Sequence, residues 1–128
     1  MTIHDRLKAI LKSNCREATG GVFEVFMPFD VKTSTYRTNT PCLIFRIEEC
    51  TDKGLGLYTL TVRIDMLGKP SEVEKLFRAV AAAFSEQQNS KTWSISLASG
   101  LFRETWDTDL NTDWGTMTLK GVAIEQRS

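Results

Sequence analysis

The sequence predicts an α+β fold: a mainly antiparallel sheet with an N-terminal helix and one main helix packed on one face of it. Two observations lead to this class. Periodic hydrophobic patterns follow one another in the order helix, several strands, helix, several strands. The connections between successive strands have hairpin length, which favours antiparallel pairing. With 128 residues, of which 41% are hydrophobic and 25% charged, the chain fits one compact domain over residues 1–128.

The N-terminal part predicts a helix, a strand and a long loop. Residues 3–14 show helical spacing of apolar residues, and Thr2 suits the N-cap position. After two glycines, residues 22–29 are β-branched or aromatic enough for a strand. Residues 30–40 hold five serine or threonine residues and no clean period. We therefore expect a long loop there, and long loops in small domains are often functional.

The middle of the chain predicts a hairpin followed by the main helix. Residues 42–50 and 58–66 alternate apolar and polar side chains, and the glycine-containing residues 51–56 between them predict the turn. Ser71 and Glu74 have the spacing of a capping box, and an apolar stripe continues from there. We expect the main helix over residues 72–87.

The C-terminal part predicts further strands. Residues 93–97 alternate as a short strand, and residues 101–106 are expected to return as its hairpin partner across Ser99 and Gly100. Residues 114–125 form the last predicted strand. Its apolar parity changes at Gly121, which indicates a bulge at that glycine.

Charge and cysteine content exclude several functional classes. Lys plus Arg and Asp plus Glu both number 16, and this balance does not favour non-specific nucleic-acid binding. Cys15, Cys42 and Cys50 cannot all pair within one chain and lie in no C-x-x-C motif, so they indicate structural thiols in a reducing compartment. We expect neither a secretion signal nor a membrane span, because no window approaches about 18 uninterrupted apolar residues.

The sequence offers little for catalysis, a cofactor or a metal. His4 is the single histidine, and it fits a solvent-facing position better than a catalytic base, although both interpretations stay open. Four oxygen-bearing residues alternate as at the start of a calcium loop: Asp107, Asp109, Asn111 and Asp113. The sixth and twelfth positions are Thr112 and Thr118 rather than glycine and glutamate. We predict no catalytic residues, no cofactor and no metal site, and an Asx-rich polar turn instead.

Two segments are candidates for contact with other proteins. The loop of residues 30–40 places Lys32, Tyr36 and Arg37 among small hydroxyl residues, and such a mixture suits an interfacial anchor. The acidic turn is flanked by Trp106 and Trp114, which fit either an exposed interface rim or the end of the core. We expect the interface to include Lys32, Tyr36, Arg37, Trp106, Asp107 and Asp109.

The two ends of the chain also differ in charge. Residues 1–46 carry seven basic and four acidic side chains, and residues 100–128 carry three and five. Opposed patches of this kind would dock head to tail on neighbouring subunits. The alternative is ordinary solubilising charge scattered over the surface.

The layout resembles a known family in three places. A short amphipathic helix opens the chain, Pro41-Cys42-Leu43-Ile44-Phe45 begins a strand, and the strand from Tyr58 to Met66 runs directly into the helix that begins around Pro70-Ser71-Glu72. Together these features are similar to those of the tail-terminator, or tail-completion (head–tail joining), proteins of long-tailed bacteriophages. Cys50 and the acidic turn match no feature of that family.

The resemblance implies an architectural protein rather than an enzyme. In that family a ring, usually of six subunits, caps the head-proximal end of the tail tube and joins it to the head-completion proteins. The implied partners are other copies of the chain, the major tail-tube protein and a head-completion protein, with DNA only passing through the lumen and no membrane. The implied location is the virion tail, assembled in the host cytoplasm.

Two other functions stay open from the sequence. One is a small ligand-binding or enzymatic α+β domain with a pocket between sheet and helix, in which Arg46, Arg63 or Asp65 would be the polar groups. The other is an adaptor elsewhere in a phage tail or a tail-like secretion system. Composition does not distinguish such an adaptor from a terminator.

Overall fold

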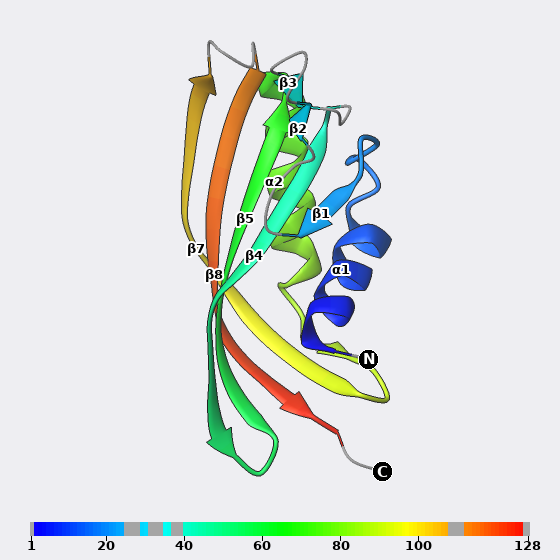
Figure 1. Ribbon diagram of the computed structural model, residues 1–128, viewed down its shortest axis with the longest axis vertical. Helices are drawn as coiled ribbons and strands as arrows, with labels where there is room; N and C mark the ends of the chain where they lie inside the picture. Colours follow the sequence, from blue (N-terminus) through cyan, green and yellow to red (C-terminus); the bar gives the residue numbers. More distant parts are fainter. Residues whose placement is uncertain (1, 25–28, 31–34, 37–39, 108–111, 127–128) are drawn as a thin grey trace.

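The computed structural model describes residues 2–24, 29–30, 35–36, 40–107 and 112–126, and Figure 1 shows the arrangement of its elements. Two helices and eight strands lie within these residues. They are α1 (Ile3–Asn14), β1 (Val22–Glu24), β2 (Phe29–Asp30), β3 (Thr35–Tyr36), β4 (Cys42–Gly54), β5 (Leu57–Gly68), α2 (Pro70–Ala83), β6 (Gln88–Asn89), β7 (Trp93–Asp107) and β8 (Thr112–Glu125). The predicted α+β class is confirmed.

The main sheet has six strands in the order β1-β4-β5-β8-β7-β6. β1 runs parallel to β4, whereas the other four neighbouring pairs are antiparallel, so the sheet is mixed. β2 and β3 form a separate antiparallel pair. Figure 1 shows that the long strands twist strongly, so that β4 and β7 exchange their left-to-right positions between the upper and lower parts of the view.

Both helices cover the same face of the sheet. Leu7 of α1, Leu76 of α2 and Ile64 of β5 are fully buried members of one apolar cluster. Alternate residues of each long strand face this cluster, as the period of two requires. The other sheet residues that complete it include Leu43, Phe45, Leu60, Val62, Met66, Ile95, Leu97, Met117, Leu119 and Ala123. We call this side the helix face and the opposite side the outer face.

Local capping explains where the two helices begin. Thr2 Oγ1 accepts a hydrogen bond from Asp5 N at 3.1 Å, and the Asp5 carboxylate accepts one from Thr2 N at 3.3 Å, which confirms the predicted cap. In α2, Lys69 N donates to Glu72 Oε1 at 2.8 Å and Pro70 occupies the first turn. Proline lacks an N–H that would stay unpaired at that position.

The predicted bounds of α2 were wrong at both ends. The helix begins at Pro70 rather than residue 72, because Glu72 caps it instead of the expected pair Ser71 and Glu74. It ends at Ala83 rather than residue 87, with Phe84 at the C-cap position. Glu74 instead accepts a hydrogen bond from Arg78 Nη2 at 2.6 Å, one turn further along the helix.

The predicted hairpin across Ser99 and Gly100 was also wrong. Residues 93–107 form one continuous strand, β7, whose pairing with β8 is irregular only between Ser99 and Phe102. The bulge expected at Gly121 is absent from the described pairing, because β8 keeps a continuous register with β5 through that residue. Gly121 instead permits a close approach of β7, since a Cβ there would lie 1.9 Å from Ser96 O.

Three shorter expectations also changed. β4 continues to Gly54, so the turn is shorter than the predicted residues 51–56. The strand expected over residues 22–29 is described only as β1, with Phe29 in β2. The segment of residues 30–40 contributes to the β2–β3 pair, so it is not wholly a loop.

Candidate functional site

One end of the molecule's long axis presents a fixed turn with an exposed leucine. The β4–β5 hairpin lies at the lower end of Figure 1, and its turn residues Gly54, Leu55 and Gly56 have φ angles of 89°, 56° and 79°. The Leu55 side chain is 105% exposed. Leucine in the left-handed region costs roughly 1–2 kcal/mol, and strain of this kind is often retained at functional positions.

Hydrogen bonds hold this turn in place. Gly54 N donates to Asp52 Oδ1 at 2.7 Å, and Glu125 N, at the end of β8, donates to Gly56 O at 2.8 Å. The turn is thereby tied to its own strand and to the neighbouring strand. Leu55 is presented to solvent by an organised backbone.

The opposite end of the long axis carries an exposed tryptophan. The end of β7 and the start of β8 lie at the upper end of Figure 1, and Trp106, near the end of β7, is 49% exposed. Trp114 instead packs on the outer face against the buried residues Cys42, Ile44 and Leu67. The two tryptophans therefore differ: Trp106 is an exposed rim residue, whereas Trp114 covers a small apolar cluster.

Two carboxylates lie together beside Trp106. Asp113 is buried and faces Trp106 across the β7–β8 ladder. A side-chain hydrogen bond with Asp113, together with desolvation and the negative charges of Asp113 and Glu74, raises the pKa of Glu104. The two carboxyl groups thus hold a proton more tightly than an isolated glutamate.

The predicted contact residues are only partly described. Lys32, Arg37 and Asp109 lie outside the described residues, as does most of the acidic turn. Tyr36 contributes backbone to β3, and Asp107 ends β7. Their assignment to an interface stays a prediction.

The polar groups expected in a pocket between sheet and helix lie on the outer face instead. Arg46 and Arg63 are direct partners in the β4–β5 ladder. Arg63 Nε donates to Asp65 Oδ1 at 3.2 Å, and Thr116 Oγ1 donates to the same oxygen at 2.8 Å. Asp65 thus accepts from Arg63 on its own strand and from Thr116 on β8. These positions do not enter the space beneath the helices, because neighbouring strand positions point to opposite faces.

The described thiols and the histidine carry no activated nucleophile. Burial raises the pKa of Cys15 and of Cys42 to about 12, so both stay protonated at neutral pH. Cys50 is exposed, contrary to the expected structural role, and partial burial and the negative charge of Asp52 raise its pKa. His4 is half exposed and its Nδ1 pairs with the Glu24 carboxylate, which joins α1 to β1.

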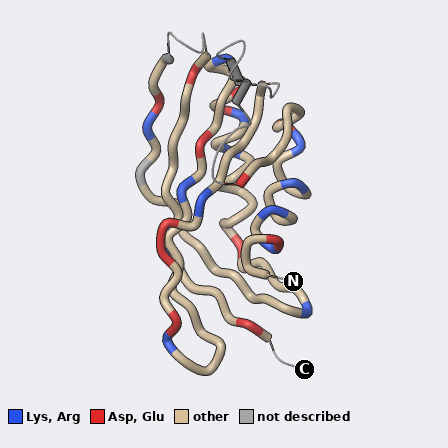
Figure 2. Tube along the Cα trace, viewed as in Figure 1, with Lys and Arg blue, Asp and Glu red and all other residues tan. Residues whose placement is uncertain are grey.

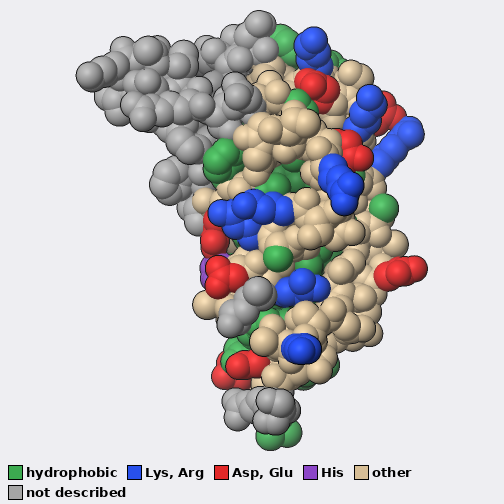
Figure 3. All heavy atoms as spheres, turned by 90° about the vertical axis from the view of Figure 1, so that its right-hand side faces the viewer, with side chains coloured by type: hydrophobic (Ala, Val, Ile, Leu, Met, Phe, Trp, Pro, Cys, Tyr) green, Lys and Arg blue, Asp and Glu red, His purple; other side chains and the backbone are tan. Residues whose placement is uncertain are grey.

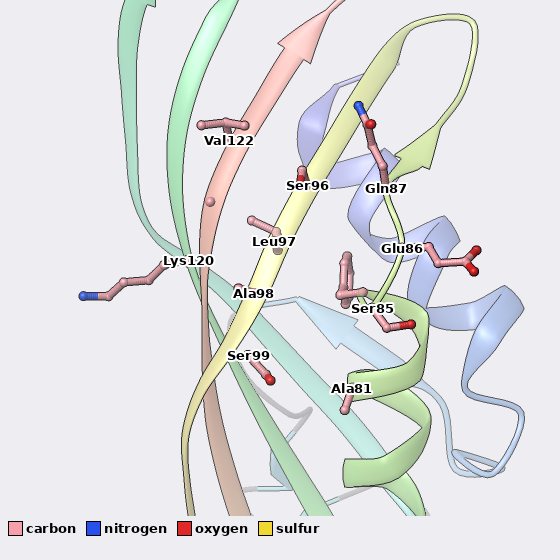
Figure 4. A pocket seen from close by; sticks show the side chains of 12 residues that line it. Ala81, Ser85, Glu86, Gln87, Ser96, Leu97, Ala98, Ser99, Lys120 and Val122 are labelled. Atoms are coloured by element: carbon pink, nitrogen blue, oxygen red, sulfur yellow. The ribbon is translucent and has the colours of Figure 1, made fainter.

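An open hollow lies between the end of α2 and the middle of β7, on the helix face of the sheet (Figure 4). Its volume is about 630 Å³. Phe84 and Leu97 contribute apolar surface, and small residues such as Ala81 and Ser99 leave the space open. Figure 4 shows that Lys120 points away from this hollow, toward the outer face.

Charge on the helix side is interspersed. Figure 2 shows basic residues along α1, and Figure 3 shows Lys and Arg side chains with Asp and Glu between them on the face that includes α1.

Within the described part of the chain, no group of three or more His, Cys, Asp or Glu residues is placed to hold a metal. No described helix is both long and apolar enough to cross a membrane.

Comparison with known proteins leaves the family open. No family model and no curated protein matches the sequence. Among solved structures, the fold is similar to a chain in the virion of a native gene transfer agent particle, with 11% sequence identity and a TM-score of 0.49. That match covers 94% of this chain and 87% of the other.

Proposed function

We propose that this protein is a structural virion protein that caps the head-proximal end of a phage tail tube as a ring and joins it to the head-completion proteins. The observation that supports this most directly is the pair of exposed apolar anchors, Leu55 and Trp106, at opposite ends of the long axis. A connector must bind one partner at each end, and exposed tryptophan and leucine side chains suit such contacts.

The sequence resemblance supplies the identity of the partners. Its clearest part, the strand that runs directly into a helix, corresponds to β5 and α2, which are separated by a single residue, Lys69. Both elements bury residues in the same core cluster. The part of the chain that resembles tail terminators is therefore the centre of the fold rather than a peripheral segment.

The outer face suits a lumen through which DNA slides. On it Arg63 is paired with Asp65, so its positive charge is compensated within the chain. Strong phosphate binding needs clustered uncompensated cations. Pairing with Asp65 removes the Arg63 charge from the free cations that DNA would meet on this face.

The predicted contact residues belong to this proposal. Lys32, Tyr36 and Arg37 would contact the tail-tube protein or a neighbouring subunit. Trp106, Asp107 and Asp109 would contribute to contacts at the same end of the molecule, because β2, β3 and the end of β7 lie there (Figure 1). The aromatic residues would act as anchors and the charged residues would select the partner.

The proposal is tested by capping of tail tubes. Tubes assembled from the major tail-tube protein of the same viral genome, mixed with this protein, should show caps at one end in electron micrographs. Because Leu55 and Trp106 lie at opposite ends, only one of Leu55→Asn and Trp106→Ser should reduce capping of tubes, and the other should reduce binding of the head-completion protein to capped tubes. Ile124→Ser, which changes another exposed apolar residue, should affect neither. Uncapped tubes at high protein concentration would refute the terminator role, and binding along the tube wall would indicate another tail adaptor.

The loop residues are tested separately. Tyr36→Ala combined with Arg37→Ala should reduce capping while the melting temperature stays within a few degrees, because surface substitutions usually change stability by less than about 0.5 kcal/mol. Normal capping by this variant would place the contact elsewhere, with Trp106 the next candidate.

A further inference from the structure

The sheet has an incompletely paired strand on each side. β1 pairs with β4 only at Leu43–Phe45, according to the register Val22↔Leu43 to Glu24↔Phe45. β6 pairs with β7 only at Ser94 and Ile95. Within the described residues, residues 46–51 (the β4 edge segment) and residues 96–101 (the β7 edge segment) therefore each have a strand on one side only.

These two edge segments lie at the same level of the sheet. One row of direct ladder partners runs from Glu49 through Thr61 and Lys120 to Ala98. The next row runs from Cys50 to Leu97, through Leu60 and Gly121. A second copy placed beside the first, without displacement along the strands, would bring its β4 edge segment next to the β7 edge segment.

The strand directions are compatible with this placement. Three antiparallel steps separate β4 from β7, so the two strands run in opposite directions. Rotation about an axis along the strands keeps these directions. The β4 edge segment of one copy would thus pair with the β7 edge segment of the next in the antiparallel manner of the rest of the sheet.

The β7 edge segment lacks the usual protection against strand addition. Its sequence, SLASGL, contains neither a charged residue nor a proline, although exposed edges are normally blocked by such residues. Hollows flank it on both faces: about 630 Å³ on the helix face (Figure 4) and about 520 Å³ on the outer face beside Thr118. Alternate side chains of an added strand would occupy these hollows in turn.

Charge complementarity favours a second copy as the added strand. Lys120 lies beside the small residue Ala98 in the same row and on the same face, and its side chain extends away from the helices. In the assembled pair, Glu49 of the second copy would occupy the next place in that row. The lysine stem would pass over the Ala98 methyl group and bring its ammonium near that carboxylate.

We propose that the β7 edge segment of one subunit binds the β4 edge segment of a second copy of this chain, so that one sheet continues from subunit to subunit. The contact joins two different surfaces, so it is heterologous and can close into a ring. This proposal deepens the proposed function and rests on it for the ring. The number of subunits is set by the rotation between copies and not by the strand pairing.

Directed cross-linking tests the contact. In a Cys50→Ser background, Glu49→Cys and Ala98→Cys in the same chain should give a ladder of covalent oligomers on mild oxidation, because directly opposed Cβ atoms lie about 4.5–5.5 Å apart. The matched control, Lys12→Cys with Ala98→Cys, keeps one cysteine at the edge and moves the other to the exposed side of α1. It should give no ladder. Dimers from Ala98→Cys alone would overturn the proposal, because they would show pairing of two β7 edges.

Charge reversal gives an independent test. For this test the two cysteines are placed at Thr51 and Ser96, which lie in one row of ladder partners and leave Glu49 in place. In that background Lys120→Glu should lower the cross-linking yield several-fold, and adding Glu49→Lys should restore it. No ladder from the first double variant, alone or with tail tubes, would overturn the edge contact. If the unmodified protein still caps tubes in that case, the proposed function stands; if the ladder forms but tubes stay uncapped, the edge contact stands and the terminator role fails.

Discussion

Replacing Gly121 by alanine should destabilise the protein strongly, because β7 and β8 approach each other closely at this position. A Cβ on Gly121 would lie 1.9 Å from Ser96 O and 2.9 Å from Leu97 Cα. A contact of at least 3.0 Å would require the first pair to move apart by 1.1 Å or more (3.0 − 1.9). Both neighbours are backbone atoms, so no side-chain rotation relieves the clash.

The expected loss of stability follows from the interactions that a separation of β7 and β8 would weaken. Separating the strands weakens roughly two ladder hydrogen bonds, at about 1 kcal/mol each, and adds overpacking strain of roughly 1–3 kcal/mol. The free energy of unfolding should therefore fall by about 3–5 kcal/mol. At roughly 3–5 °C per kcal/mol for a chain of this length, the melting temperature should fall by about 9–25 °C.

Thermal and urea unfolding followed by circular dichroism measure this change. Gly100→Ala is the matched control, because it lies in the same strand pair and its Cβ would meet only Thr118 O, at 3.1 Å. That contact needs a shift of a few tenths of an ångström, so the control should lose less than about 1 kcal/mol. Equal losses in the two variants would refute the close approach of β7 and β8 at Gly121.

Three further outcomes are expected. Leu55→Asn should raise the free energy of unfolding by up to about 1 kcal/mol in urea titrations, because asparagine tolerates the left-handed region better than leucine; a loss of stability would show that Leu55 packs against something. Glu104→Gln should reduce the fall in melting temperature as the pH rises from about 4.5, since the folded state, with its raised pKa, binds the Glu104 proton more tightly than the unfolded state and loses that stabilisation as the pH rises; an unchanged pH profile in this variant would contradict the raised pKa. A thiol reagent should label Cys50 rapidly and the other two cysteines only on unfolding, because both are buried with a pKa near 12; rapid labelling of all three would contradict their burial.

Local sequence determined much of the fold. The span of α1 follows from its apolar spacing and from the Thr2 cap, and both act within one or two turns. The alternation of β4 and β5, joined by a glycine-rich turn, likewise encodes their antiparallel pairing. These features depend on near neighbours in the chain, so periodicity and turn chemistry are sufficient to predict them.

The candidate contact surfaces could be predicted only in part. The sequence left open whether Trp106 and Trp114 lie at an exposed rim or at the end of the core, and the structure exposes Trp106. Leu55 was missed because a leucine in a turn between two glycines looks like a chance surface residue until its φ angle is known. The edge segments were missed for a different reason: whether a strand has one neighbour or two is not a property of its own residues.

Tertiary structure alone decided the roles of the glycines in the C-terminal half. From the sequence, Gly100 was expected to reverse the chain and Gly121 to mark a bulge, since glycine favours both. In the fold, β8 supplies a partner along both halves of β7, so the strand continues past Gly100. The approach of Ser96 in β7 requires Gly121 to lack a side chain. The sequence therefore determined that the backbone at Gly100 and at Gly121 can adopt unusual conformations or allow close contact. Strand pairing between segments that are distant in the chain decided which of the two each glycine provides.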